Sequence, residues 1–363
     1  MRRRYCGPLN ELLFAVRASQ LDILFLLDKQ PVYSKFRFIY KPKTIIMKRL
    51  LFVCLLFIVI NSLAQNDSSV IISTPRPAEF TNTKVFYSQK AINSKTVEVH
   101  PKGILDFSID HYFGDIAGDA GGPKHGFFGL DAIKDVRIGF QLGLSDRLNI
   151  IFARAKGSGP VTNQYEWGLK YQALRQKDND PTHPLSLTFF ANDVLSAMKS
   201  TGDSSSHFEN SFEDFGSRHS QVVQVLVARK FGKVSLQLNP LYLHTNNVLP
   251  YDQENLLAVG GAIRWPLSKK FVLIADYFHT FRSQSSIDSF ASRGIGFHDP
   301  FGIGFEIITE GHVFHLNFTN ATDILENRFI RGTTSSWGEG QFRWAFTLTR
   351  NFVVFRDKKA KGK

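Results

Sequence analysis

The 363-residue sequence contains only two cysteines, Cys6 and Cys54, and both precede residue 65. The rest of the chain can therefore form no disulfide bond, no thiolate metal site and no cysteine nucleophile. The sequence also contains no GxxxxGK[ST] phosphate-binding loop, no HExxH motif and no GxSxG motif. We therefore expect no cofactor and no bound metal.

The chain also has no basic region in its central part, although its formal net charge is +12. Residues 1–64 contain eleven Lys/Arg against three Asp/Glu, and the last eight residues, RDKKAKGK, contain five against one. These two segments account for the whole excess, so the region between them is formally neutral. This distribution gives no basic groove and argues against a nucleic-acid partner.

The sequence has no apolar run long enough for a membrane-spanning helix, but it has one of the length found in export signals. Residues 47–64 read MKRLLFVCLLFIVINSLA, with a basic start, eleven apolar residues from Leu50 to Ile60, and small residues at Ser62 and Ala64. A spanning helix needs about 20 apolar residues. We therefore predict a secretory signal peptide at 47–64 and export to the outer membrane.

The segments around this signal predict the organisation of the whole chain. Residues 1–46 precede the signal, so we interpret them as a non-native leader from a mis-assigned start; a cytoplasmic extension is the alternative. Residues 65–96 are polar and contain Pro75 and Pro77, which predicts a flexible periplasmic lead-in. The barrel described next is expected over 97–355, with a basic tail at 356–363.

What the sequence has in quantity is aromatic, glycine-rich strand sequence, with 34 phenylalanines and 27 glycines in the full chain. Most predicted strands have about ten to twelve residues, close to the ~9–11 needed to cross a bilayer at a tilt. Short connections alternate with long ones rich in Gly, Ser, Asp and Asn, as in a barrel with periplasmic turns and external loops. Strands are predicted at 103–113, 134–144, 147–156, 164–174, 185–194, 219–230, 233–244, 255–265, 270–281, 300–309, 312–320 and 341–352.

Apolar and polar residues alternate along these strands. In the fourth, Trp167 and Leu169 share one face, whereas Glu166 and Lys170 share the other. Alternation alone does not separate a soluble sandwich from a membrane barrel, but the signal, strand lengths and loop pattern favour the barrel. Hydrocarbon offers no partner to a free sheet edge, so the first and last strands must pair. The predicted fold is all-β: a closed antiparallel up-and-down transmembrane β-barrel of about 12 strands.

Several segments resemble a family of gram-negative bacterial β-barrel proteins that is catalogued only as a domain of unknown function. They are HYFGD (111–115), RIGFQLGLSDRLNI (137–150), PLSLTFF (184–190), ARKFGKVSLQLNPLYLH (228–244) and GHVFHLNFTN (311–320). The resemblance covers most of the mature chain and implies an outer-membrane barrel. It implies no substrate, cofactor or catalytic residue.

Polar residues on the predicted inner faces are the candidate site. Asp276 lies in a strand that is apolar on both faces, and an inward orientation avoids a charge facing lipid. The tyrosines and three tryptophans, Trp167, Trp265 and Trp344, are assigned to the interface girdle or the lipid-facing surface. His312 and His315 are assigned to opposite faces, which excludes one shared metal. The candidate lumen-lining residues are Arg137, Gln141, Glu166, Lys170, Asp276, Glu306, Asn317 and Arg343.

Three functions remain open at this stage. A passive channel or transporter for small solutes is favoured. A lipid-acting hydrolase with a Ser/His pair is an alternative, with His279 and His315 as candidate residues, and a closed structural or partner-binding barrel is another. Expected partners are outer-membrane lipid and small solutes; the sequence does not determine the solute, the oligomeric state or whether the lumen is filled.

Overall fold

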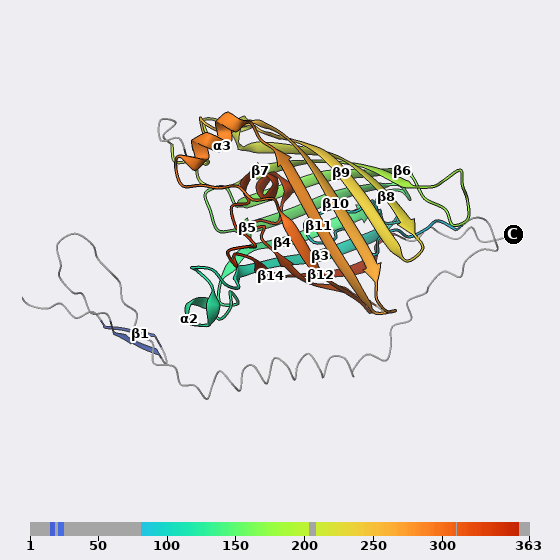
Figure 1. Cartoon of the computed structure of the whole chain (residues 1–363), viewed down its shortest axis with the longest axis horizontal. Helices are drawn as coiled ribbons and strands as arrows, with labels where there is room; N and C mark the ends of the chain where they lie inside the picture. Colours follow the sequence, from blue (N-terminus) through green and yellow to red (C-terminus); the bar gives the residue numbers. More distant parts are fainter. Residues whose placement is uncertain (1–14, 19–20, 25–80, 203–207, 310, 356–363) are drawn as a thin grey trace, which may run out of the picture. The chain divides into compact units, whose positions relative to one another are not determined.

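The computed structural model describes residues 15–18, 21–24, 81–202, 208–309 and 311–355 (Figure 1). Two compact units are present, residues 1–73 and 74–363. In the first unit, β1 (Ala15–Ala18) and β2 (Leu21–Leu24) form an antiparallel pair. The predicted signal peptide and the basic tail lie outside the described residues.

The second unit is a closed barrel of twelve antiparallel strands, each paired with its neighbours in sequence. Each strand lies within three residues of its predicted position at either end. The strands are β3 (Ile104–Asp115), β4 (Ile133–Gly143), β5 (Leu148–Gly157), β6 (Asn163–Leu174), β7 (Ser186–Ser196), β8 (His219–Phe231), β9 (Val234–Thr245), β10 (Asn255–Pro266), β11 (Phe271–Phe281), β12 (Phe301–Ile308), β13 (Val313–Thr319) and β14 (Arg343–Val353).

Pairing of β14 with β3 closes the barrel, as the sequence predicts. Their register runs from Arg343 opposite Asp115 to Val353 opposite Ile104, with one irregularity after Arg343. Because this pair is complete, the sheet has no free edge that would leave backbone N–H and C=O groups without partners.

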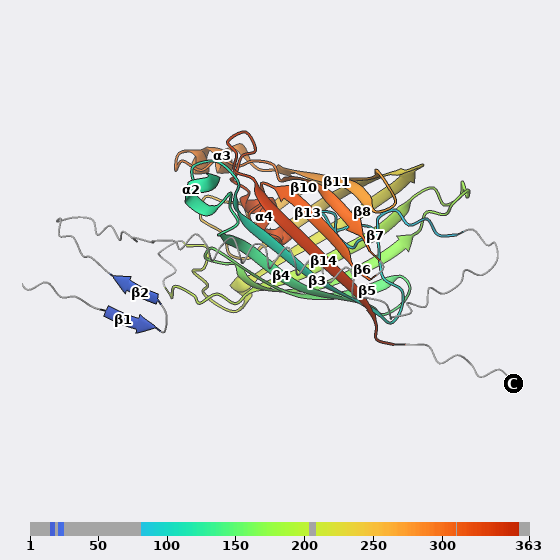
Figure 2. The same ribbon diagram turned by 90° about the horizontal axis from the view of Figure 1, so that it is seen from below.

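The two ends of the barrel differ in their connections. At the short-turn end, which also holds the C-terminal end of β14, three of the turns are 144–147, 232–233 and 267–270. At the long-loop end lie α2 (Gly122–Gly126), the 3-10 helix Gly216–Arg218, α3 (Gln284–Ala291) and α4 (Glu326–Gly332). Figure 2 shows α2 and α3 at this end. None of the helices in the described part of the chain is long and apolar enough to cross a membrane.

The outer wall is apolar. Trp167 and Leu169 on β6 are 44% and 55% exposed, whereas Glu166 and Lys170, which flank them in sequence, are fully buried. The same alternation places Phe140, Phe152 and Leu238 outside. A continuous exposed apolar surface of this kind fits contact with lipid and would be an aggregation liability in water.

Candidate functional site

All eight candidate lumen residues are buried in the barrel interior. Six of them take part in the separate groups of polar contacts described below: Arg137, Gln141, Glu166, Lys170, Asp276 and Glu306. Arg343 lies at the long-loop end, where its Nη2 contacts Asp115 at 2.6 Å and Ser335 Oγ at 3.0 Å. The Asn317 side chain is buried and makes no hydrogen bond to the described residues.

The barrel interior is occupied by residues 83–98, which we call the plug. The segment reverses direction at Ile92 and Asn93, since Ala91 N donates to Ser94 O and Thr96 N donates to Gln89 O. It starts at the short-turn end, where Thr83 N donates to Gln176 O, and returns there, where the His100 amide and carbonyl bond the Asn149 side chain.

The described part of the predicted lead-in therefore differs from the sequence-based expectation. Residues 81–96 were expected to be flexible and periplasmic, yet Val85, Ile92 and Asn93 are completely buried. The physical reason is that the barrel wall supplies the hydrogen bonds and apolar contacts that this segment cannot make alone. Residues 65–80 lie outside the described residues.

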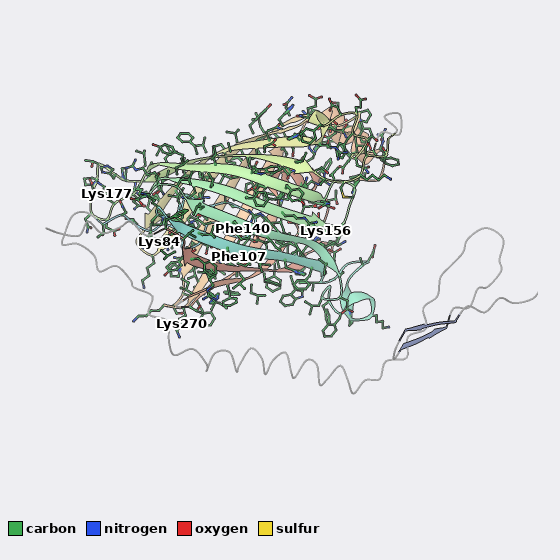
Figure 3. The ribbon with its side chains drawn as sticks, turned by 180° about the vertical axis from the view of Figure 1, so that it is seen from behind. Lys84, Phe107, Phe140, Lys156, Lys177 and Lys270 are labelled. Carbon is green, nitrogen blue, oxygen red and sulfur yellow. The ribbon has the colours of Figure 1, made fainter. Side chains whose placement is uncertain are left out.

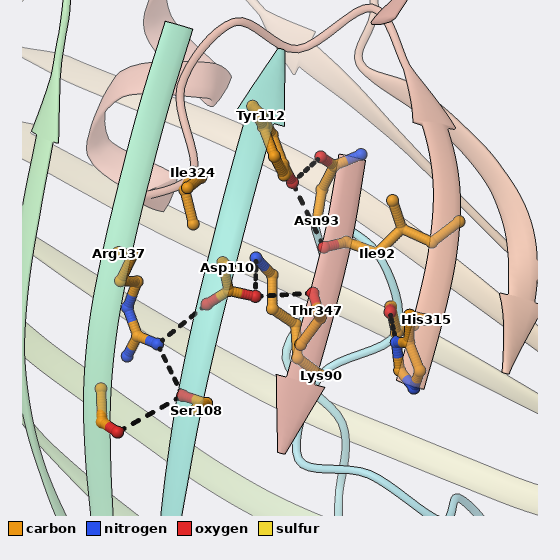
Figure 4. A network of polar contacts seen from close by, with 12 residues as sticks. Lys90, Ile92, Asn93, Ser108, Asp110, Tyr112, Arg137, His315, Ile324 and Thr347 are labelled. Atoms are coloured by element: carbon orange, nitrogen blue, oxygen red, sulfur yellow. Dashed lines mark hydrogen bonds and ion pairs between the residues drawn. The ribbon is translucent and has the colours of Figure 1, made fainter. Parts of the chain in front are cut away.

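Asp276 of β11 binds the turn of the plug. Its Oδ2 accepts hydrogen bonds from three successive backbone amides, those of Ile92 (3.0 Å), Asn93 (2.6 Å) and Ser94 (2.8 Å). Its Oδ1 accepts a bond from Asn93 Nδ2 at 2.9 Å. Tyr112 Oη of β3 donates to Asn93 Oδ1 at 2.9 Å (Figure 4). Asp276 therefore compensates buried backbone donors that would otherwise be costly.

The wall also approaches the plug closely at Gly302 of β12. A Cβ atom built there would lie 2.7 Å from Ile92 Cγ2 and 2.9 Å from Asp276 Oδ1. Only a residue without a side chain leaves room for both the turn and its carboxylate partner.

Two plug lysines join an ion-pair network on β3, β4 and β6. Lys90 Nζ lies 3.3 Å from Asp110, and Lys95 Nζ lies 3.3 Å from Glu166. Arg137 connects the two carboxylates, at 3.2 Å from Asp110 and 2.8 Å from Glu166. Figure 4 shows Arg137, Asp110 and Lys90 in a row across neighbouring strands. Each charge of this network is therefore paired with an opposite one, as burial requires.

Polar side chains of the wall also bind the plug on both sides of its turn. Gln89 Oε1 accepts bonds from Gln141 Nε2 at 2.7 Å and from Lys170 Nζ at 3.0 Å. Val97 donates its amide to Gln237 Oε1 and accepts from Thr188 Oγ1. The backbone of the plug thus finds its partners in side chains of the wall instead of in a strand of its own.

A further polar group surrounds Ser88 of the plug. It contains Glu306 of β12 and His315 of β13. Ser88 Oγ lies 2.9 Å from Glu306 Oε2 and 3.0 Å from His315 Nε2, and Arg264 Nη2 lies 2.7 Å from Glu306 Oε1. The His315 Nδ1 atom bonds the carbonyl of Ala91. A catalytic triad places the carboxylate on the ring nitrogen remote from the serine, whereas here it lies on the same side. Ser88 and His315 are also buried.

The other histidine considered for hydrolysis, His279, lies on the outer wall. Its Nδ1 contacts Asp299 Oδ2 at 2.9 Å. No serine hydroxyl bonds this ring among the described residues, so a nucleophile is missing from this pair. His312 and His315 do lie apart, the first in a turn and the second in the interior.

Apolar contacts complete the filling of the lumen. Val85, Phe86, Ala91 and Val97 of the plug pack with inward residues of the wall, which include Ile151, Phe190 and Leu226. At the turn, Ile92 packs with Val272 and Ile274 of β11.

The loop between β13 and β14 fills the long-loop end of the lumen. Ile324 and Phe329 are buried in a cluster with Phe278 and Tyr112. Glu326 of α4 is buried, 3.7 Å from Lys95, and burial raises the pKa of its carboxyl group, an effect that Lys95 partly opposes. Tyr112 is thus an interior residue, which corrects its assignment to the girdle or lipid surface.

Two cavities of the barrel, one beside the plug and one at the long-loop end, are of water size. One of about 30 Å³ lies between Lys90, Lys95 and the inward residues of β3, β4 and β14. Another of about 40 Å³ lies at the long-loop end beside Arg328 and Arg331. A single water molecule occupies a comparable volume, so neither cavity accommodates a solute in this conformation.

Sequence reasoning placed the wall residues but missed the plug. A signal was present in the strands, because β11 is apolar on both faces and its inward Val272 and Ile274 require an apolar partner inside the barrel. Tyr112 had a signal too, since it lies two residues from the inward Asp110 and therefore shares its face.

Comparisons with solved structures identify outer-membrane proteins that align over most of both chains but have little sequence identity with this one. The NanC porin is 7% identical, with a TM-score of 0.39 over 69% of this chain and 100% of that one. The COG4313 outer membrane channel from Pseudomonas putida F1 is 10% identical, with a TM-score of 0.43 over 70% and 98%. Outer membrane phospholipase A from Escherichia coli is 11% identical, with a TM-score of 0.36 over 73% and 98%.

No curated protein sequence matches the chain. A family model, in contrast, matches residues 86–352, a span that begins within the plug and ends in the last strand. The chain therefore belongs to the membrane-bound β-barrel domain family DUF5777.

Proposed function

We propose that this protein is an outer-membrane channel for small hydrophilic solutes and that its plug closes the lumen in the conformation described above. The observation that carries the proposal is the chemistry of the wall facing the plug. It consists largely of charged and amide side chains, among them Arg137, Glu166, Lys170 and Gln237.

A barrel built only to stay closed would gain little from such a lining. Replacing buried ion pairs with well-packed apolar residues is often neutral or stabilising. A polar inner wall is, however, required wherever the lumen holds water. The wall chemistry therefore supports a state in which the plug is withdrawn and water replaces it.

The connection of the plug to the wall supports the same proposal. Apart from the chain that enters β3, the plug is held by hydrogen bonds, ion pairs and apolar contacts alone. These contacts can be exchanged for water, whereas the strand pairs that form the barrel stay closed. Withdrawal therefore needs no unfolding of the wall.

The test is the current through planar bilayers that contain the purified full chain, compared with a variant lacking residues 83–98. We expect a higher mean current for the deletion. A variant lacking α3, which belongs to a loop outside the plug contacts, serves as the matched control and should behave like the full chain. Heat-modifiable electrophoretic mobility checks that each variant is folded.

Two outcomes would contradict the proposal. If the folded deletion variant carries no current, removal of the plug does not open a path through the barrel, and the proposal fails. If the full chain and the deletion carry the same current, the plug does not close the lumen. The proposal also includes no catalytic activity, so hydrolysis of phospholipid by the detergent-extracted protein would favour the hydrolase alternative.

A further inference from the structure

The outer wall carries two cations that face away from the barrel at the long-loop end. Arg154 and Lys156 lie two residues apart on β5, and both are exposed while Ala153 and Ala155 between and beside them are buried. Residues at this spacing share a face, about 7 Å apart. Figure 3 shows Lys156 near one end of the wall, with Phe140 and Phe107 nearer its middle.

These two cations lack the carboxylate partners that other outward groups at the same end of the barrel have. At the same end of the barrel, His219 pairs with Asp193 at 2.7 Å and His279 pairs with Asp299 at 2.9 Å. Among the described residues, no carboxylate lies within ion-pair distance of Arg154 or Lys156. Arg154 bonds the neutral Asn163 at 3.2 Å and faces the Tyr165 ring.

An apolar hollow adjoins the two cations. Its volume is about 440 Å³, and it is lined by Arg154 and Lys156 together with Ile133, Val136 and Ile138 of β4. The strand register places Val136 opposite Lys156 and Ile138 opposite Arg154, so charged and apolar residues form one continuous surface.

Unpaired cations on a lipid-facing wall are costly in hydrocarbon and become tolerable only near the interface, where headgroup phosphates lie. We propose that this hollow binds the phosphate group of a membrane lipid, with an acyl chain over Val136 and Ile138. Arg154 still has unused guanidinium donors for phosphate oxygens, and Lys156 contributes a second charge.

The proposal is tested on the full chain in detergent by native mass spectrometry with two probes. These are bis-phosphorylated lipid A and the same lipid without its phosphates. We expect the phosphorylated lipid to bind more than tenfold more strongly, because each basic residue near a lipid phosphate contributes about a fivefold factor. The double variant Arg154→Gln/Lys156→Gln should lose this preference and bind the dephosphorylated lipid as before.

The matched control is Lys269→Gln/Lys270→Gln, which removes two exposed cations from a turn at the opposite end and should keep the preference. If the double variant does not fold, Lys156→Gln alone decides, because the Lys156 side chain makes no hydrogen bond or ion pair to the part of the chain that the structure describes. This variant should reduce the preference about fivefold.

A preference that survives in the folded variant, or its absence from the unmodified protein, would overturn the proposal. Displacement of lipid by inorganic phosphate alone would show a free-anion site and would also overturn it. The binding measurement is independent of ion conduction, so its failure and that of the proposed channel are distinguishable.

Discussion

Removal of the Asp276 carboxylate is the perturbation that most specifically addresses the plug. In the variant Asp276→Ala, the amides of Ile92, Asn93 and Ser94 lose the acceptor that lies 2.6–3.0 Å away. A buried donor left without an acceptor costs about 1–3 kcal/mol, so three such amides should destabilise the inserted plug by about 3 kcal/mol or more, and each ~1.4 kcal/mol changes an equilibrium tenfold. The fraction of molecules with a withdrawn plug should therefore rise roughly a hundredfold or more.

The assay uses the position of Ala91, which is 2% exposed beside the turn. A single cysteine placed there, with Cys6 and Cys54 changed to serine, reacts with a membrane-impermeant maleimide only when the plug leaves the lumen. The labelling rate should increase with the withdrawn fraction.

The matched control is Asp115→Asn, because this residue pairs with Arg343 in the same lumen and makes no hydrogen bond or ion pair to the plug. It should label as slowly as the unmodified background. Equal labelling rates for the folded Asp276→Ala variant and its parent would refute the assignment of Asp276 as the main anchor of the turn.

Three further changes test other parts of the structure. Gly302→Ala should increase Ala91→Cys labelling through a steric cost of about 1–3 kcal/mol, whereas Gly168→Ala, where a Cβ would have ordinary contacts at 3.4 Å, should not. Leu169→Arg should lower the free energy of unfolding in lipid by about 2–4 kcal/mol if this outward residue faces the bilayer centre; unchanged stability in urea titrations would argue against that position. Because burial raises the Glu326 pKa above its unfolded value, the folded state takes up a proton more readily, so stability should rise as pH falls toward the ordinary pKa of a glutamate. Glu326→Gln should remove that component of the pH dependence of thermal unfolding, and an identical profile would contradict it.

The sequence was sufficient to predict the wall of the barrel because hydrocarbon imposes a strict pattern. Trp167 and Leu169 must face lipid, Glu166 and Lys170 must not, and strand length follows from bilayer thickness. The closing β14–β3 pair follows from the same constraint, since no edge can remain free.

The plug could not be predicted in the same way. It contains no strand ladder and no periodic pattern, because its backbone bonds side chains such as Asp276 and Gln237 that are distant in sequence. A polar segment of this kind has the composition of a flexible linker, and only its tertiary partners distinguish the two. The candidate lumen residues were found from the alternation of inward and outward positions along the strands. Their partners on the plug follow no such alternation and were not found.

The central claim is that residues 83–98 lie inside the barrel and are held there by its wall. Hydrogen–deuterium exchange of the full chain in lipid nanodiscs tests it most directly, because the amides of Ile92, Asn93, Ser94 and Val97 are bonded to buried side chains. We predict that peptides covering 89–97 exchange as slowly as the strands of the barrel, and faster after Asp276→Ala. Complete exchange of these peptides within seconds in the unmodified protein would contradict the claim.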